Sequence, residues 1–93
     1  MPQIFRIGTY IIHFWSNEGI PLEPIHVHIS KGKPSAYSTK VWIYKNGECV
    51  VDENDKTKIP SFQLKYILQL IEKNKDDIEE MWIERFGEIT YKD

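Results

Sequence analysis

The sequence has few of the features that mark secreted, disulfide-bonded or membrane proteins. Its 93 residues include a single cysteine, Cys49, which excludes an internal disulfide and a metal site built from cysteines alone. No apolar run is long enough to cross a membrane, and the first residues lack the basic start and long apolar core of a signal peptide. We therefore expect a cytoplasmic protein in a reducing compartment, with no membrane partner.

Positive charge is not in excess either. The formal net charge is −2, which leaves only a local basic patch as a route to nucleic acid. The hydrophobic share of 41% and the charged share of 28% are ordinary for a soluble domain, and 93 residues make one small domain, 1–93. The aromatic share of 13% is high for this size, so we expect aromatic side chains to form much of the core.

The first half of the chain has the patterns of antiparallel strands. Residues 3–7 and 10–15 predict a hairpin around Gly8-Thr9, because glycine tolerates the positive φ that begins a type II′ turn. Residues 36–44 and 48–52 predict a second hairpin with Asn46-Gly47 as a two-residue turn. This register places Trp42, Tyr44, Cys49 and Val51 on one face and Val41, Ile43 and Val50 on the other.

Between the hairpins, residues 24–30 alternate strictly between apolar and polar side chains. Such alternation predicts a half-buried strand, with His26 and His28 together on an exposed face. The opposite face, which we expect in the core, carries Ile25, Val27 and Ile29.

The last third predicts two helices. Pro60 suits a first helical turn, and the apolar stripe of the helix that follows is Leu64, Ile67, Leu68 and Ile71. Asn74 is expected to end this helix and cap the next, whose apolar stripe is Ile78, Met81 and Trp82 and whose C-cap is Gly87. A short strand over 89–91 is also expected. Strands first and helices last indicate an α+β fold: a curled antiparallel sheet of about five strands followed by a C-terminal helical hairpin.

His26 and His28 are the candidate catalytic residues, because histidine acts as general acid or base near neutral pH. The turn that follows carries Lys31 and Lys33, which are the candidate phosphate-binding residues. Together these residues allow a metal-independent ribonuclease, with RNA as partner. The plainer alternative is that the imidazoles hydrogen-bond to neighbouring groups and fix the loops.

The same histidines are too few for a confident zinc site, which needs three or four protein ligands. Completion would have to come from His13, Cys49, Glu18, Glu23, Asp52 or Asp55, and the sequence does not say which of them lies near. We therefore predict no cofactor, and zinc binding that is weak or absent.

Three stretches together resemble a known family. They are Met1-Pro2-Gln3-Ile4, the Pro-x-His-x-His segment from Pro24 to His28, and C-terminal helices containing Trp82. The chain resembles the small bacterial proteins called domain of unknown function 4160, although Glu23 and Ile25 flank Pro24 where the family often has a double proline. The resemblance implies small partner genes nearby and membership of toxin–antitoxin modules.

A protein-interaction module is the function that we favour. Residues 10–15 and 36–44 carry apolar side chains on both faces, and two short helices can cover only one face of the sheet. The uncovered face would bind a second copy or a small cognate protein. Whether the chain is an enzyme is not decided by its sequence.

Overall fold

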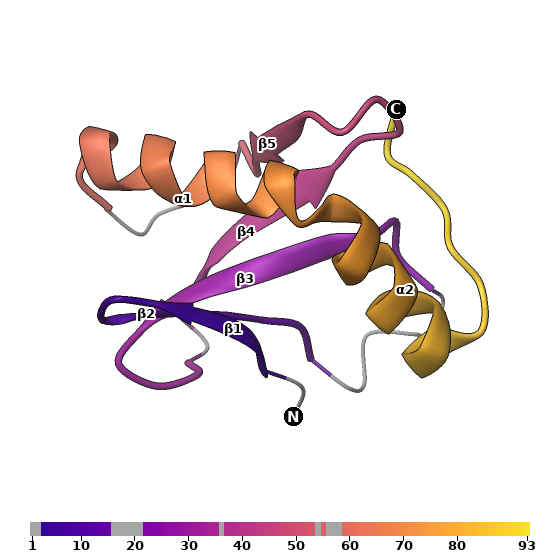
Figure 1. Cartoon of the computed structure of the whole chain (residues 1–93), viewed down its shortest axis with the longest axis horizontal. Coiled ribbons are helices and arrows are strands. Elements are labelled where there is room, and N and C mark those ends of the chain that lie inside the picture. The colour runs from indigo at the N-terminus through magenta and orange to yellow at the C-terminus, as the bar shows by residue number, and fades with distance from the viewer. Residues whose placement is uncertain (1–2, 16–21, 36, 54, 56–58) are drawn as a thin grey trace.

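The computed structural model describes residues 3–15, 22–35, 37–53, 55 and 59–93. These residues form an open, five-stranded antiparallel sheet in the order β1-β2-β3-β4-β5, followed by two helices (Figure 1), which confirms the predicted α+β fold. The elements are β1 (Gln3–Ile7), β2 (Tyr10–His13), β3 (His26–Lys31), β4 (Thr39–Ile43), β5 (Cys49–Val51), α1 (Ser61–Lys73) and α2 (Lys75–Phe86). The start of the strand predicted from 36 and the candidate metal ligand Glu18 lie outside the described residues.

The first hairpin forms as predicted. Ile7 pairs with Tyr10, so the turn contains only Gly8 and Thr9. Gly8 has a φ of +57°, as the first position of a type II′ turn requires. Among the described residues, only glycines have a positive φ. A β-bulge interrupts the pairing between Gln3 and Phe5.

The second hairpin has a longer turn than predicted, so the predicted register is wrong. Ile43 pairs with Cys49, and the Tyr44 N–H donates to the Glu48 carbonyl at 2.9 Å, which leaves three turn residues, 45–47. Gly47 closes the turn with a φ of +93°, as in a type I turn followed by a left-handed glycine. This one-residue shift moves Cys49 and Val51 to the face of Ile43.

The helices begin and end close to the predicted residues. Pro60 precedes α1, and Gly87 ends α2 with a φ of +81° while its N–H donates to the Ile83 carbonyl. Asn74 separates the helices, but its side chain donates back to the Leu70 carbonyl at 2.8 Å and makes no capping bond to α2. Asn74 therefore closes α1, and the predicted side-chain cap of α2 is wrong.

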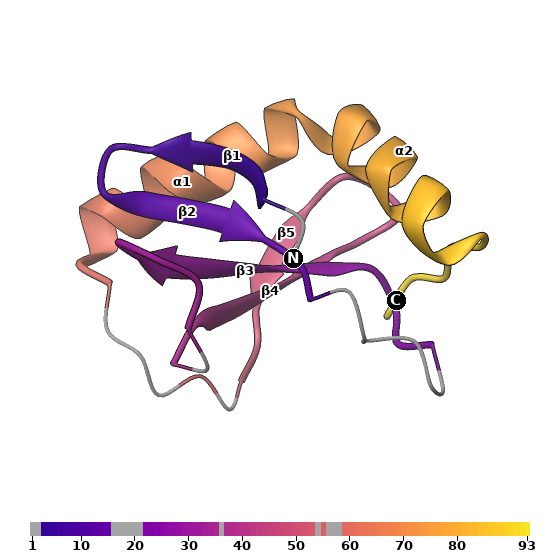
Figure 2. The same ribbon diagram turned by 90° about the horizontal axis from the view of Figure 1, so that it is seen from below.

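Both helices cover the same face of the sheet (Figure 2). The predicted inward residues of β3 are confirmed there, since Ile25 and Val27 are fully buried and Ile29 is nearly so. The strands and helices together bury one aromatic and aliphatic core, made of Ile12, Phe14, Ile25, Val27, Ile29, Val41, Ile43, Cys49, Ile67, Ile71, Ile78 and Trp82.

The opposite face of the sheet is also buried, in contrast to the expected uncovered face. Ile11 is 2% exposed and Trp42 is 8% exposed. Part of the cover is the C-terminal segment 88–93, which forms no strand, although the Ile25 N–H donates to the Thr90 carbonyl at 2.9 Å. The Lys92 ammonium lies 4.3 Å from the ring centroid of Trp42. The apolar side chains that sequence reasoning assigned to an interface are therefore largely buried within one chain.

Candidate functional site

Three histidines lie side by side on the face of the sheet that points away from α1, and the ring of His26 also reaches Trp82 of α2, at 5.4 Å between centroids. His13 pairs with His28 across β2 and β3, and His26 is two residues further along β3 on the same face. The rings of His13 and His28 stack with 5.6 Å between centroids, and those of His28 and His26 meet edge to face at 5.1 Å. We call His13, His28 and His26 the histidine row. Sequence reasoning found two members and left His13 unplaced.

The histidine row is mostly inaccessible. His26 and His13 are both 0% exposed and His28 is half-buried, so the predicted exposed face is wrong. Tryptophans enclose the row: Trp15 lies 5.2 Å from His13, and Trp42 lies 5.2 Å from His26, measured between ring centroids. Aromatic packing of this kind stabilises a core and keeps a reactant from reaching the buried rings.

Each histidine forms a hydrogen bond that holds a neighbouring segment. His26 Nδ1 lies 2.9 Å from the Pro24 carbonyl oxygen, and because a carbonyl only accepts, Nδ1 carries the proton. His28 Nδ1 lies 2.9 Å from Ser38 Oγ, which anchors the segment before β4. These contacts favour the plainer prediction that the imidazoles fix the loops. A catalytic role for His26 and His28 stays a prediction.

His13 extends this bonding to the turn after β3. Its Nε2 lies 2.7 Å from Ser30 Oγ, and the Ser35 N–H donates to the same hydroxyl at 3.3 Å. The buried hydroxyl of Ser30 thus joins β2 to the turn that carries Lys31 and Lys33. These hydrogen bonds pair buried polar groups with one another, as the interior of a folded domain requires.

Trp42 organises the charges next to His26. Its Nε1 donates to Asp52 Oδ1 at 3.0 Å, and the ammonium of Lys40 lies 4.3 Å from the Trp42 ring centroid. Lys40 also donates to Glu23 Oε1 at 3.0 Å. The ammonium of Lys92 lies at the same distance from this ring, so Trp42 makes two cation–π contacts. Lys40 therefore contacts both Trp42 and Glu23, and Lys92 contacts Trp42.

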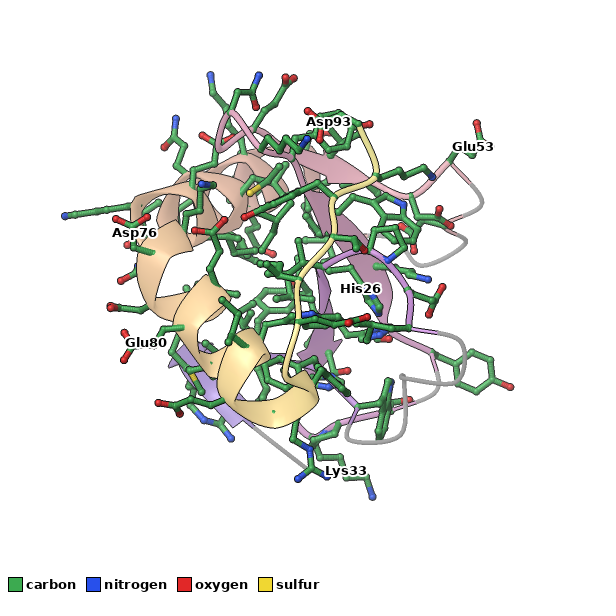
Figure 3. All side chains as sticks on the ribbon, turned by 90° about the vertical axis from the view of Figure 1, so that its right-hand side faces the viewer. His26, Lys33, Glu53, Asp76, Glu80 and Asp93 are labelled. Carbon is green, nitrogen blue, oxygen red and sulfur yellow. The ribbon has the colours of Figure 1, made fainter. Side chains whose placement is uncertain are left out.

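The predicted phosphate-binding lysines lie away from His26. Lys31 is exposed at the far end of β3, about 17 Å from His26 along the strand at about 3.3 Å per residue, and the exposed Lys33 follows in the turn after β3. Figure 3 shows Lys33 and His26 at separate places on the molecule. Arg6 joins the lysines through a 3.5 Å contact from Nη2 to the Gly32 carbonyl. The structure thus gathers a small basic cluster but does not unite it with the buried histidine.

The described residues form no metal-binding constellation. Across ranges 3–15, 22–35, 37–53, 55 and 59–93, no group of three or more histidine, cysteine, aspartate or glutamate side chains is placed to hold a metal ion. Cys49 points into the helix-covered core, where burial raises the pKa of its thiol from 9.0 to about 12. A thiol this weakly acidic is a poor ligand and a poor nucleophile.

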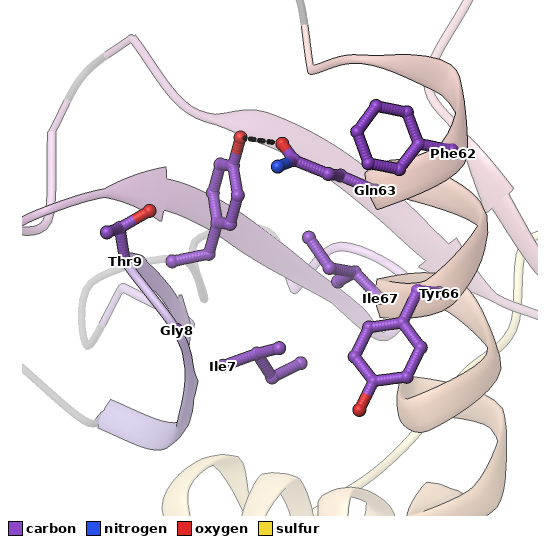
Figure 4. Close-up of a pocket in the computed structure, with 8 residues that line it drawn as sticks. Ile7, Gly8, Thr9, Phe62, Gln63, Tyr66 and Ile67 are labelled. Carbon is purple, nitrogen blue, oxygen red and sulfur yellow. Dashed lines mark hydrogen bonds between the residues drawn. The ribbon is translucent and has the colours of Figure 1, made fainter.

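An apolar groove that sequence reasoning missed lies on another side of the molecule. It has a volume of about 270 Å³ and runs between the β1–β2 turn and α1 (Figure 4). The exposed rings of Phe62 and Tyr66, at 75% and 57%, line it from α1. Tyr10 Oη donates a hydrogen bond of 2.8 Å to Gln63 Oε1, and both residues line the groove. We call this the Phe62 groove, lined by Ile7, Gly8, Thr9, Tyr10, Phe62, Gln63, Tyr66 and Ile67.

The sequence carried a signal for this groove. Phe62 and Tyr66 are four residues apart on α1 and lie outside the apolar stripe that faces the core. Two aromatic residues outside the stripe of an amphipathic helix indicate a second apolar surface.

Comparison with known proteins supports the resemblance seen in the sequence. No curated protein and no solved structure matches the chain. No helix of the described residues has the length and apolar character that crossing a membrane requires. The domain of unknown function DUF4160 matches residues 9–83, a range that includes the histidine row and the α1 side of the Phe62 groove. The chain therefore belongs to the DUF4160 family.

Proposed function

We propose that this chain is a protein-interaction module that binds its partner in the Phe62 groove. The observation that carries the proposal is the exposure of Phe62 and Tyr66, at 75% and 57%, beside an apolar hollow. Large aromatic side chains that remain exposed in groups are typical of interfaces, where they supply much of the binding energy.

The size and lining of the groove favour a protein side chain as its occupant. A volume of about 270 Å³ is at the lower end of the range of roughly 300–1,000 Å³ found for small-molecule sites. The eight lining residues include no charged group, so the groove offers apolar contact and few fixed hydrogen bonds. Such a surface suits an aliphatic or aromatic residue that projects from a folded partner.

The open edges of the sheet support the groove as the binding surface. β1 is interrupted by a bulge and carries the exposed Arg6, and β5 has only three residues. Bulges, charges and short length are devices that prevent strand addition at an edge. A partner is therefore better accommodated by the groove than by extending the sheet.

We place this pairing in the cytoplasm, where a single free cysteine stays reduced, and we propose a small cognate protein from a neighbouring gene as partner. This pairing is the toxin–antitoxin-like arrangement that the family resemblance implies. Co-expression of the tagged chain with the product of the adjacent gene tests it directly.

The decisive variant replaces Phe62 and Tyr66 by serine, and its matched control replaces Lys65 and Glu80, which are exposed and lie outside the groove lining, by serine. We expect the partner to co-purify with wild type and control, and its affinity for the groove variant to fall about tenfold or more. Unchanged melting temperatures show that both variants fold. Equal affinity for the groove variant and wild type contradicts the proposal.

A further inference from the structure

A second hollow opens between the sheet and the beginning of α1, where β3 ends and β4 begins. Its volume is about 460 Å³. Tyr10 and Gln63 line both this hollow and the Phe62 groove, and the hydrogen bond that joins them separates the two (Figure 4). We call it the Lys31 hollow, and its other lining residues are Ile29, Lys31, Tyr37, Thr39, Ile59 and Pro60.

The Lys31 hollow differs from the Phe62 groove in size and in charge. Its volume lies well within the range of roughly 300–1,000 Å³ found for small-molecule sites. Among the described residues that line it, Lys31 is the only charged one. Within the part of the chain that the structure describes, no carboxylate forms an ion pair with the Lys31 ammonium. An exposed ammonium without a counterion, set in the wall of a hollow, attracts an anionic group.

The rest of the lining suits a flat apolar body. Ile29 is 2% exposed and belongs to the core, and Ile59 and Pro60 add further apolar contact from the side of α1. Tyr37 lines the same hollow although it is 87% exposed. Its ring is therefore accessible to an aromatic ligand, and two aromatic rings attract each other when they stack with an offset.

We propose that the Lys31 hollow binds a small aromatic anion, with its ring against Tyr37 and its carboxylate or phosphate paired with the Lys31 ammonium. Both anions present negatively charged oxygens that accept hydrogen bonds from lysine. The lining offers a single cation, whereas a nucleic-acid strand is bound along a groove with several. This site is distinct from the Phe62 groove that we propose for a protein partner, and it adds a ligand to that function.

NMR titration of the isotope-labelled full chain tests the site with two probes, phenylacetate and adenosine monophosphate, which distinguish a carboxylate from a phosphate. Their neutral counterparts, phenylacetamide and adenosine, keep the ring and lack the anion. We expect the amide shifts of Lys31, Tyr37 and Thr39 to saturate with at least one of the two anions. The neutral counterpart of that anion should bind about tenfold more weakly, because the contact with the ammonium is lost.

Two lysine variants separate pairing with Lys31 from general attraction to positive charge. Lys31→Gln should weaken binding of the anion about tenfold and leave binding of its neutral counterpart unchanged. Lys65→Gln is the matched control, since Lys65 is equally exposed and lies outside the hollow, and it should bind like wild type. Tyr37→Ser should weaken binding of the anion and of its neutral counterpart alike.

Either of two results overturns the proposal. One is the absence of saturating shifts at these amides with both anions up to about 10 mM. The other is wild-type affinity for the anion in Lys31→Gln, with melting temperatures showing that the variants fold. The variant with serine at Phe62 and Tyr66 should bind the anion normally, since neither residue lines the hollow. Loss of the protein partner and loss of the small ligand are therefore separate results.

Discussion

Replacing His26 by alanine separates a structural histidine from a catalytic one. The imidazole is 0% exposed, contacts the rings of Trp42 and Trp82 at 5.2 and 5.4 Å between centroids, and donates to the Pro24 carbonyl. Alanine removes both the packing and the donor. A solvent-exposed catalytic residue, by contrast, could be truncated with little effect on folding.

The loss of stability follows from these contacts. Truncating a buried ring of this size costs about 2–3 kcal/mol, and leaving the Pro24 carbonyl without its donor adds about 1 kcal/mol. For a domain of this length, a total of about 3–4 kcal/mol corresponds to a fall in melting temperature of about 12–32 °C. The half-buried His28 should cost only about 1 kcal/mol when replaced by alanine.

Urea unfolding followed by tryptophan fluorescence measures both variants against wild type. Equal slopes of unfolding free energy against urea concentration show that the comparison is valid. We expect the midpoint to fall strongly for His26→Ala and slightly for His28→Ala. If the unfolding free energy of His26→Ala differs from that of wild type by less than about 0.5 kcal/mol, the reasoning from burial is refuted, because surface substitutions have effects of that size.

Three further predictions follow from other parts of the chain. Because burial raises the pKa of the Cys49 thiol from 9.0 to about 12, the unfolded thiol ionises first and the unfolding free energy should fall as pH rises from 9 towards 12. Cys49→Ala should flatten that alkaline slope, and an unchanged slope would contradict the assignment. Gly87→Ala forces a side chain into a φ of +81° and should destabilise by about 1 kcal/mol in the same urea assay, whereas no loss would show that the helix end rearranges. Zinc should bind weakly or not at all, and one zinc per chain by elemental analysis would overturn this expectation.

Local patterns predicted the elements well because short-range chemistry decides them. Gly8-Thr9 permits a two-residue turn, and strict alternation put Ile25, Val27 and Ile29 in the core. The Asn46-Gly47 turn failed because the same pair also fits a three-residue loop ending in a left-handed glycine. A choice between these turns depends on which residues the helices will cover, and that is not a local property.

The candidate site could be predicted only in part. Its third histidine, His13, is placed by the pairing of β2 with β3, and no short turn fixes that register. Burial of the row depends on contacts between distant residues, such as Trp42 with Lys92. Alternation showed which residues share a face but could not show that this face is covered.

The range of the family match shows which experiments bear on the family and which on this chain. Residues 9–83 include the histidine row, Phe62 and Tyr66. The segment with Thr90 and Lys92 lies outside that range, although Lys92 covers Trp42. Substitutions at Phe62 or Tyr66 therefore address a surface within the matched range. A change at Lys92 addresses a contact made from outside the matched range.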